Sequence, residues 1–581
     1  MLEFLSKVKF WHNPDILAIF ALLFFSIFAL KDLARPGFYT SHDGETHIAR
    51  IAQYNQTITD GQIPPRWAKT LNGGLGSPIF VYIYPLPYLF GSIIHFFGLN
   101  FTTSFELLMA LTFIFSGLFT FLWLKEVFNS TGAAFIGALF YTWVPYRFSL
   151  IYVRGSISEA LAYTFIPALL WMLTKLSKNL ELKTIAIASL FLAAVLLSQN
   201  LVAYIALPVI AMYILILSVL RKSLKYFATA FFISLWGLSI SSVTYIPVIF
   251  ERNLIHFDEL FQKVYNSHFV TITQLIHSPW GYGFSLPGLN DSLSFQIGLA
   301  HLLVVFLAIL CLALLALIPR SFISGRQIEK TQLTLAIFFL STFLLSTTLM
   351  LENKLVHAFW QNFKPIQFID IPWRFLGITA ISTAFLAAFI TKLSKNKFVL
   401  LFLIIAVLVA NRNHLRINEQ KFYSDEFFIR YQGSATQYNE FTPRTRHSTG
   451  VTDDFVSRAE SIKGNIKIYD LSQKSHQISF KTQNDVPARI QVNLINFKGW
   501  QIFMDGQKFV NNPTLVDKSY NFSYRPKVDT SGLYDLIVPP GQHHFVYKYK
   551  ETLLRNVANT ISIISFTLVL FAIVKRQHAR V

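Results

Sequence analysis

The chain has 581 residues, of which 53% are apolar and only 14% are charged. Soluble domains carry about 25% charged residues, so this composition argues against a soluble enzyme and excludes disordered and fibrous proteins. The single cysteine, Cys311, excludes an internal disulfide and any CxxC metal or redox site. The formal net charge of +19 indicates either a nucleic-acid surface or a signal of membrane topology.

Twelve apolar stretches resemble membrane-spanning helices, which need about 20 residues. They lie at 12–30, 105–124, 131–148, 159–176, 184–199, 201–219, 227–249, 295–318, 332–351, 374–392, 397–410 and 553–574. The first stretch follows Lys7 and Lys9 as a signal peptide would, but no small-residue cleavage site follows it. We therefore expect an uncleaved anchor there.

Basic residues in the short connections predict the orientation, because loops rich in Lys and Arg stay in the cytoplasm. Five basic triplets follow the N-terminal pair: Lys175, Lys178, Lys183; Arg221, Lys222, Lys225; Arg320, Arg326, Lys330; Lys392, Lys395, Lys397; and Lys575, Arg576, Arg580. An even number of crossings must separate these clusters. A further apolar stretch, 79–98, therefore has to lie at the outer surface, which leaves twelve spans and both termini in the cytoplasm. Most of the positive charge is then an orientation signal, and no nucleic-acid partner is expected.

This topology places residues 31–104, 250–294 and 411–552 outside. The last segment alternates polar and apolar residues, as at 488–494 and 544–549, and contains the turn signals Asp505-Gly506 and Pro539-Pro540-Gly541. Such alternation predicts an antiparallel β-sandwich. The expected fold is a mainly α, polytopic membrane protein with a membrane domain at 1–410, an extracytoplasmic β-rich domain at 411–552, and a last span and tail at 553–581.

The first outer loop begins with His42-Asp43-Gly44-Glu45-Thr46-His47, which crowds two carboxylates and two histidines. Glycines and prolines later in the loop predict a fixed, irregular path. The cluster is a candidate catalytic site, and an ordinary solvated loop is the alternative, since exposed loops are polar by default.

Two further clusters lie at the predicted outer face. Arg154-Gly155 precedes Glu159, which either caps a helix dipole or faces a cavity. Arg374 enters the 374–392 span and either snorkels or grips a lipid phosphate. Trp280, in an aromatic loop, either shapes a sugar or lipid site or packs at the interface.

Carboxylates and arginines on one side of a membrane suit transfer from a polyprenyl-phosphate-linked sugar. A carboxylate removes the proton of the acceptor hydroxyl, and cations stabilise the departing phosphate. The sequence contains no GxxxxGK[ST] or GxGxxG nucleotide loop.

The order of these motifs resembles the GT-C superfamily of membrane glycosyltransferases. Within it the chain is similar to a bacterial branch that includes YfhO-type proteins and 6-pyruvoyl-tetrahydropterin-synthase-related membrane proteins. The matching residues are the 42–47 motif, Gly61 and Pro65-Arg66-Trp67, Gly76-Ser77-Pro78, Tyr84 to Tyr88, Arg154-Gly155 with Glu159, Phe497 to Gly506, Val538 to His543, and the last span after Arg555.

The resemblance implies that Asp43 is the catalytic carboxylate and general base, with Glu45 and Glu159 beside it. It implies that Arg374 binds the carrier phosphate and that Arg154 lines the same cavity. His42, His47, Arg66 and Trp280 are further candidates for contact with the substrate. No cofactor is certain, but some members of the superfamily use a divalent metal, for which Asp43, Glu45 and His47 are the candidate ligands. The implied partners are a polyprenyl-phosphate sugar donor, a glycan, lipid or protein acceptor outside the cytoplasmic membrane, and the bilayer itself.

Two other functions stay open. A transporter or flippase of lipid-linked sugars is one, although no internal repeat supports it. A non-catalytic scaffold for envelope assembly, whose β domain binds cell-wall glycan, is the other.

Overall fold

The computed structural model describes residues 13–260, 263–286, 291–317, 329–394, 396–436, 438–447, 457–509 and 532–575, and the short strands at 516–517, 522–523 and 527–528. Seven of the basic residues used to predict the topology lie outside this part of the chain: Lys7, Lys9, Arg320, Arg326, Lys395, Arg576 and Arg580.

Within the described residues, eight helices are long and apolar enough to cross a membrane. They are α6 (Phe101–Phe128), α9 (Ile157–Leu176), α11 (Asn200–Leu220), α16 (Leu299–Leu317), α18 (Lys330–Met350), α20 (Leu376–Ser394) with the turn before it from Pro372, α21 (Lys397–Asn411) with the turn after it to His414, and α23 (Leu553–Val574). A ninth span results if α12 (Leu224–Ile240) and the segment that begins with α13 (Ser242–Glu251) are counted together, although they meet at 74°.

Four apolar helices are shorter: α2 (Pro14–Ala29), α5 (Leu86–Phe96), α7 (Thr131–Thr142) and α10 (Leu182–Ser198). Each of the twelve predicted spans thus contains an apolar helix. The stretch 79–98 holds only α4 (Ile79–Tyr82) and the 11-residue α5, which is too short to span.

The predicted span 131–148 is not one continuous helix. Helix α7 ends at Thr142, and Pro145 begins the separate turn α8 (Pro145–Phe148). Proline disfavours helical backbone at the residue before it, and Val144 is extended with ψ 140°. A π-helical turn, η3 (Ser149–Val153), follows and leads directly to Arg154. Such turns are frequent at functional sites.

Side-chain caps fix the ends of these helices. Asn100 accepts a hydrogen bond from the Thr103 N–H at the start of α6, and Ser130 does the same for Ala133 in α7. Asn129 ends α6 in the left-handed conformation, with φ 44°. Only Asn129 and Ser130 therefore separate the two helices.

The first loop, residues 31–104, is more regular than its sequence predicts. It contains η2 (Lys31–Ala34), β1 (Phe38–Tyr39) and the 16-residue helix α3 (Gly44–Thr59), for which no element was predicted. The later part, at 60–78, contains no helix or strand, as its glycines and prolines predict. Strand β1 pairs antiparallel with β2 (Gln420–Lys421), and the adjoining α22 (Asp425–Ile429) packs on α3. The remaining short helices are η4 (Arg252–Leu254), α14 (Phe257–Leu260), η5 (Val264–Ser267), α15 (Ile272–Ile276), α19 (Lys354–Asn362), η6 (Lys364–Phe368), η7 (Pro372–Phe375) and η8 (Arg412–His414).

The predicted β-sandwich is present as two antiparallel sheets. One has the order β11 (Lys527–Val528), β12 (Leu533–Val538), β6 (Ala488–Ile495), β3 (Ala459–Lys463). The other has the order β4 (Lys467–Lys474), β5 (Gln477–Asn484), β13 (Gly541–Tyr549), β7 (Trp500–Met504), β8 (Gln507–Lys508). Strands β9 (Val516–Asp517) and β10 (Phe522–Ser523) form a separate pair. The alternating stretches at 488–494 and 544–549 are β6 and β13, as predicted.

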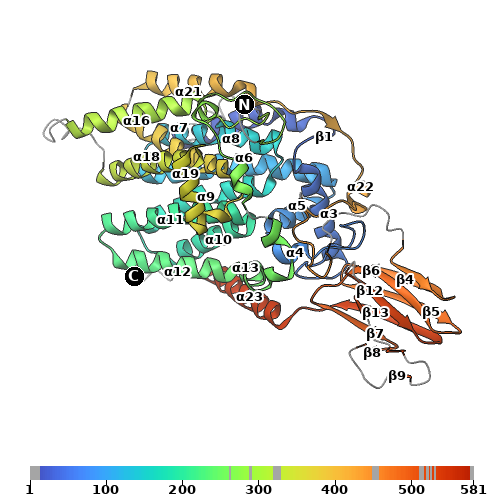
Figure 1. The fold of residues 1–581 in the computed structure, drawn as a ribbon. Helices are drawn as coiled ribbons and strands as arrows, with labels where there is room; N and C mark the ends of the chain where they lie inside the picture. Colours follow the sequence, from blue (N-terminus) through green and yellow to red (C-terminus); the bar gives the residue numbers. More distant parts are fainter. Residues whose placement is uncertain are drawn as a thin grey trace, which may run out of the picture.

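The sandwich and the first loop share one hydrophobic core. Trp67 of the first loop is buried with its ring 5.4 Å from Trp500, and about as close to Phe497 and Tyr549 at 6.1 Å each. In Figure 1 the strands lie beside α3, α4 and α22 at one end of the roughly parallel apolar helices. The first loop therefore sits between the helical bundle and the sandwich.

Candidate functional site

The candidate site is centred on Glu159 in the first turn of α9. Its side chain is 1% exposed, and its Oε1 accepts a 2.7 Å hydrogen bond from Arg154 Nη2 and another from Arg374 Nη1. The Tyr146 hydroxyl donates to Oε2 at 2.9 Å. A buried carboxylate needs this degree of pairing, because an unpaired charge in the interior is costly.

Arg374 extends the cluster to a second acid. It lies in η7, where Pro372 begins the turn that enters α20. Its Nε and Nη2 donate to the two carboxylate oxygens of Asp370 at 2.8 and 2.9 Å. A bidentate pair of this kind fixes the guanidinium in one orientation. The two arginines predicted from separate clusters therefore meet on one glutamate.

Backbone hydrogen bonds place Asp43 at the same cluster. The N–H of His42 donates to Val153 O at 3.0 Å, and the N–H of Asp43 donates to Arg154 O at 2.9 Å. Gly155 follows with φ +60°, a conformation that favours glycine. The loop that begins α3 and the loop that begins α9 are thus joined directly, with Asp43 beside Arg154.

Charge balance raises the pKa of Arg154. Burial alone lowers it, but the adjacent Glu159 more than compensates, so the pKa lies above its ordinary value. The guanidinium also stacks on Trp373, 4.9 Å from the ring centroid. Arg154 is therefore a permanent cation.

A second polar layer runs along α3. His47 lies 3.2 Å from the Tyr88 hydroxyl through Nδ1, and Arg50 donates to Ala435 O at 2.7 Å and to the Tyr88 hydroxyl at 3.1 Å. Burial, together with the charges of Arg50 and Arg154, holds the pKa of His47 well below its usual value. His47 is thus a neutral imidazole at pH 7.

His42 and Glu45 point to other neighbours. His42 Nε2 lies 3.0 Å from Tyr282 O and its ring stacks on Phe284 at 4.4 Å, while the Glu45 carboxylate accepts from the Tyr423 hydroxyl. The described residues contain no group of three His, Cys, Asp or Glu side chains able to hold a metal ion. The candidate ligands Asp43, Glu45 and His47 therefore do not form a three-residue metal site.

Within the described part of the chain, Arg66 and Trp280 form no hydrogen bond or ion pair with Glu159, Arg154 or Arg374. Arg66 pairs with Glu551 at 2.7 Å and donates to Asn559 Oδ1 at 2.8 Å and Val243 O at 3.2 Å. It thereby joins the first loop to the start of α23. Trp280 packs edge-on against His414, with ring centroids 4.9 Å apart.

Four residues of the site were not among the predicted site residues: Arg50, Tyr146, Asp370 and Glu440. Asp370 stands four residues before Arg374, a spacing that pairs opposite charges on a helical turn and was a usable signal. Glu440 is buried, it accepts a hydrogen bond from the Thr436 hydroxyl, and the charges of Arg50 and Asp370 both act on its pKa. It lies 281 positions from Glu159 in the numbering, so no local pattern points to it.

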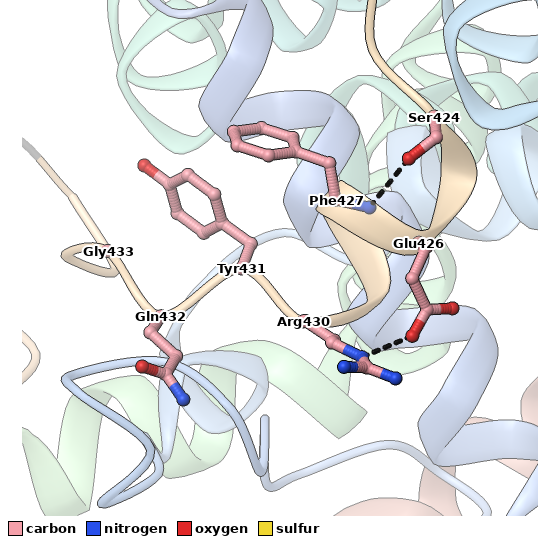
Figure 2. Close-up of a pocket in the computed structure, with 7 residues that line it drawn as sticks. All are labelled: Ser424, Glu426, Phe427, Arg430, Tyr431, Gln432 and Gly433. Atoms are coloured by element: carbon pink, nitrogen blue, oxygen red, sulfur yellow. Dashed lines mark hydrogen bonds and ion pairs between the residues drawn. The ribbon is translucent and has the colours of Figure 1, made fainter. Parts of the chain in front are cut away.

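A shallow hollow lies to one side, along α22. Figure 2 shows Ser424, Glu426, Phe427, Arg430 and Tyr431 around it, with Glu426 paired to Arg430. No predicted site residue lines this hollow. We therefore assign the site to the Glu159 cluster.

The fold and the buried ion-pair cluster together define a polytopic membrane protein whose functional candidates gather at one end of its helices. The family model that matches this chain, over residues 80–415, is described as 6-pyruvoyl-tetrahydropterin synthase related domain; membrane protein. The chain belongs to this family.

Two further proteins are similar to parts of the chain. An uncharacterized protein of Lactococcus lactis subsp. cremoris is 27% identical over 159 residues, which is 27% of this chain and 26% of that protein. The apo Archaeoglobus fulgidus oligosaccharyltransferase shares 14% identity with a TM-score of 0.35, over 74% of this chain and 57% of that one. A TM-score of 0.35 is too low for this likeness to support a conclusion about fold or function.

Proposed function

We propose that this protein is a membrane glycosyltransferase that moves a sugar from a polyprenyl-phosphate donor to an acceptor outside the cytoplasmic membrane. The observation that supports it best is the backbone pairing of Asp43 with Arg154, because it brings a carboxylate next to two buried arginines. A base and a phosphate-binding cation are the two groups that this transfer requires.

In the proposed reaction the acceptor hydroxyl oxygen attacks the anomeric carbon of the donor sugar. The bond between that carbon and the phosphate oxygen breaks, and the phosphate leaves on its polyprenyl chain with the bonding electron pair. Asp43 takes the hydroxyl proton. Arginine charge stabilises the phosphate as it gains negative charge.

The carboxylates around Asp43 have different roles in this proposal. Glu159 and Asp370 are occupied by Arg154 and Arg374, so they hold the arginines in place rather than react. Glu45, held by Tyr423, and the neutral His47 lie beside Asp43 on α3 and would contact the acceptor. The first loop and the sandwich face the outside, and both termini face the cytoplasm, by the charge rule.

The test is transfer by the purified full-length protein in lipid nanodiscs. The donors are a panel of polyprenyl-phosphate hexoses, the acceptor is a crude extract of envelope glycans and lipids, and the readout is released polyprenyl phosphate. Asp43→Asn should reduce the rate by a factor of about 100 or more, as expected for loss of a general base. The matched control is Asp470→Asn, which changes an exposed aspartate on β4 and should keep the wild-type rate.

Wild-type rates in Asp43→Asn would contradict the role of Asp43. Movement of the donor across the bilayer without a covalent product would favour the flippase instead.

A further inference from the structure

Arg154 has a donor group that the protein does not use. Its side chain is 7% exposed, and its Nη2 is bound to Glu159. Among the residues that the structure describes, its Nη1 is buried and has no hydrogen-bond partner. A buried donor left without a partner is unfavourable, and in native proteins it calls for an explanation such as a catalytic role or a bound ion.

Arg374, by contrast, has no free nitrogen. Its Nε and Nη2 bind Asp370, and its Nη1 binds Glu159. The arginine that the sequence assigned to the carrier phosphate is thus already occupied by two carboxylates. Each of its three nitrogens already donates to a carboxylate, whereas Arg154 Nη1 donates to none in the described part of the chain.

Ser41 supplies a second group without a partner among the described residues, next to Gly155, the residue that follows Arg154. Its Oγ is buried and has no partner within the described part of the chain. A Cβ on Gly155 would lie 2.4 Å from Ser41 Oγ and 3.0 Å from the N of Gly44. The serine hydroxyl, the Gly155 backbone and the first N–H of α3 therefore meet at one point, and only a glycine fits there.

The first turn of α3 completes this surface. Asp43 precedes the 16-residue helix without a side-chain capping bond, so it leaves the N–H groups of the first turn uncapped by its carboxylate. Arg154 acts on residues at both ends of this turn. After burial, its positive charge contributes to the lowered pKa values of His42, before the turn, and His47, after it. A helix N-terminus and a guanidinium are both suited to an anion.

We propose that Arg154, Ser41 and the first turn of α3 form the phosphate-binding site of this protein, and that Arg374 does not bind the phosphate. The assignment of this phosphate to a polyprenyl donor rests on the proposed function. Phosphate accepts from Arg154 Nη1, from the Ser41 hydroxyl and from the α3 N–H groups. Asp43, at the same turn, then stands beside the sugar that the phosphate carries.

The experiment measures phosphate binding by purified full-length protein in nanodiscs, by thermal stabilisation. The probes are polyprenyl phosphate in the nanodisc lipid and, separately, inorganic phosphate in the buffer. A ligand that binds only the folded state raises the melting temperature with concentration, which gives its Kd. We expect wild-type protein to be stabilised by polyprenyl phosphate.

Ser41→Ala is the decisive variant, because it removes a hydroxyl that has no partner among the described residues. It should leave the ligand-free melting temperature unchanged or higher, and it should weaken polyprenyl-phosphate binding by about tenfold. Ser77→Ala is the matched control, since Ser77 lies in the same loop and its Oγ is also buried without a partner among the described residues. It should bind like wild type.

The two arginines are compared as lysine variants, which keep the charge. Arg154→Lys should weaken binding by about tenfold, because lysine lacks the guanidinium fork. Arg374→Lys should lower the ligand-free melting temperature and keep the wild-type Kd. Unchanged binding in Ser41→Ala, or an equal loss in Arg374→Lys and Arg154→Lys, would overturn the proposal.

The two probes separate the site from the reaction. Binding of inorganic phosphate alone, weakened in Ser41→Ala, would overturn the assignment to a lipid-linked donor. Ser41-dependent binding of polyprenyl phosphate without any sugar transfer would support this site and contradict the proposed function.

Discussion

The substitution Glu159→Gln tests whether the charge cluster holds the site together. The glutamate is buried and joins Arg154, Arg374 and the Tyr146 hydroxyl. Glutamine keeps the size but removes the negative charge, so Arg154 loses its ion-pair partner while Arg374 keeps Asp370. Breaking a buried ion pair on one side costs ~3–5 kcal/mol. Because only one of the two arginines is left unpaired, we expect a loss at the lower end, about 3 kcal/mol.

The assay is unfolding of the protein in mixed micelles by increasing denaturing detergent. A control, Glu419→Gln, changes an exposed acid and should stay within about 0.5 kcal/mol of wild type. The double variant Arg154→Gln with Glu159→Gln should regain part of the loss, since it removes the unpaired charge. A loss below about 1 kcal/mol in the single variant, or no recovery in the double variant, would refute the reasoning.

Three further predictions concern stability. The pKa of His47 is lowered in the folded protein, so below about pH 6.5 the unfolded chain binds a proton that the folded chain does not. The free energy of unfolding should therefore fall as the pH is lowered from 7.5 to 5. In His47→Gln this fall should be less steep. Burial raises the pKa of Glu440, so its ionisation costs stability as the pH rises above the unfolded pKa. Glu440→Gln should therefore raise the free energy of unfolding more at pH 8 than at pH 5, and an equal change at both pH values would argue against this cause. Trp67→Ala should lower the free energy of unfolding by about 3–5 kcal/mol, because Trp67 fills the core of the sandwich. The strands should then become sensitive to limited proteolysis. Strands that stay resistant would show that the sandwich does not need the first loop.

The sequence predicted the apolar helices and the sandwich because each depends on local periodicity. The 20-residue rule finds α6, α9 and α11, and the alternation at 488–494 and 544–549 finds β6 and β13. It failed at 131–148, where apolar composition hides the break that Pro145 imposes. Composition measures whether a segment can enter a membrane, and proline decides whether it is one helix.

The site could be predicted only in part. The sequence singled out Asp43, Arg154, Glu159 and Arg374 separately, but the contact of Arg374 with Glu159 joins residues 215 positions apart. Nothing local shows that every nitrogen of Arg374 already donates to Asp370 or Glu159, or that Arg154 Nη1 has no hydrogen-bond partner among the described residues. Arg66 was predicted as a site residue because it lies in a sequence motif. A motif shows only the neighbours of a residue in the sequence, and Glu551, the ion-pair partner of Arg66, comes close to it only in the fold.

The most direct test of the account is mass spectrometry of envelope glycans from three strains: one with the gene, one without it, and one complemented with Asp43→Asn. We expect one glycan of the strain with the gene to lack a sugar in the strain without it. The Asp43→Asn strain should show the same loss while its membranes contain normal amounts of the protein. Restoration of the complete glycan by Asp43→Asn would contradict the catalytic role of Asp43, and identical glycans in all three strains would contradict glycosyl transfer itself.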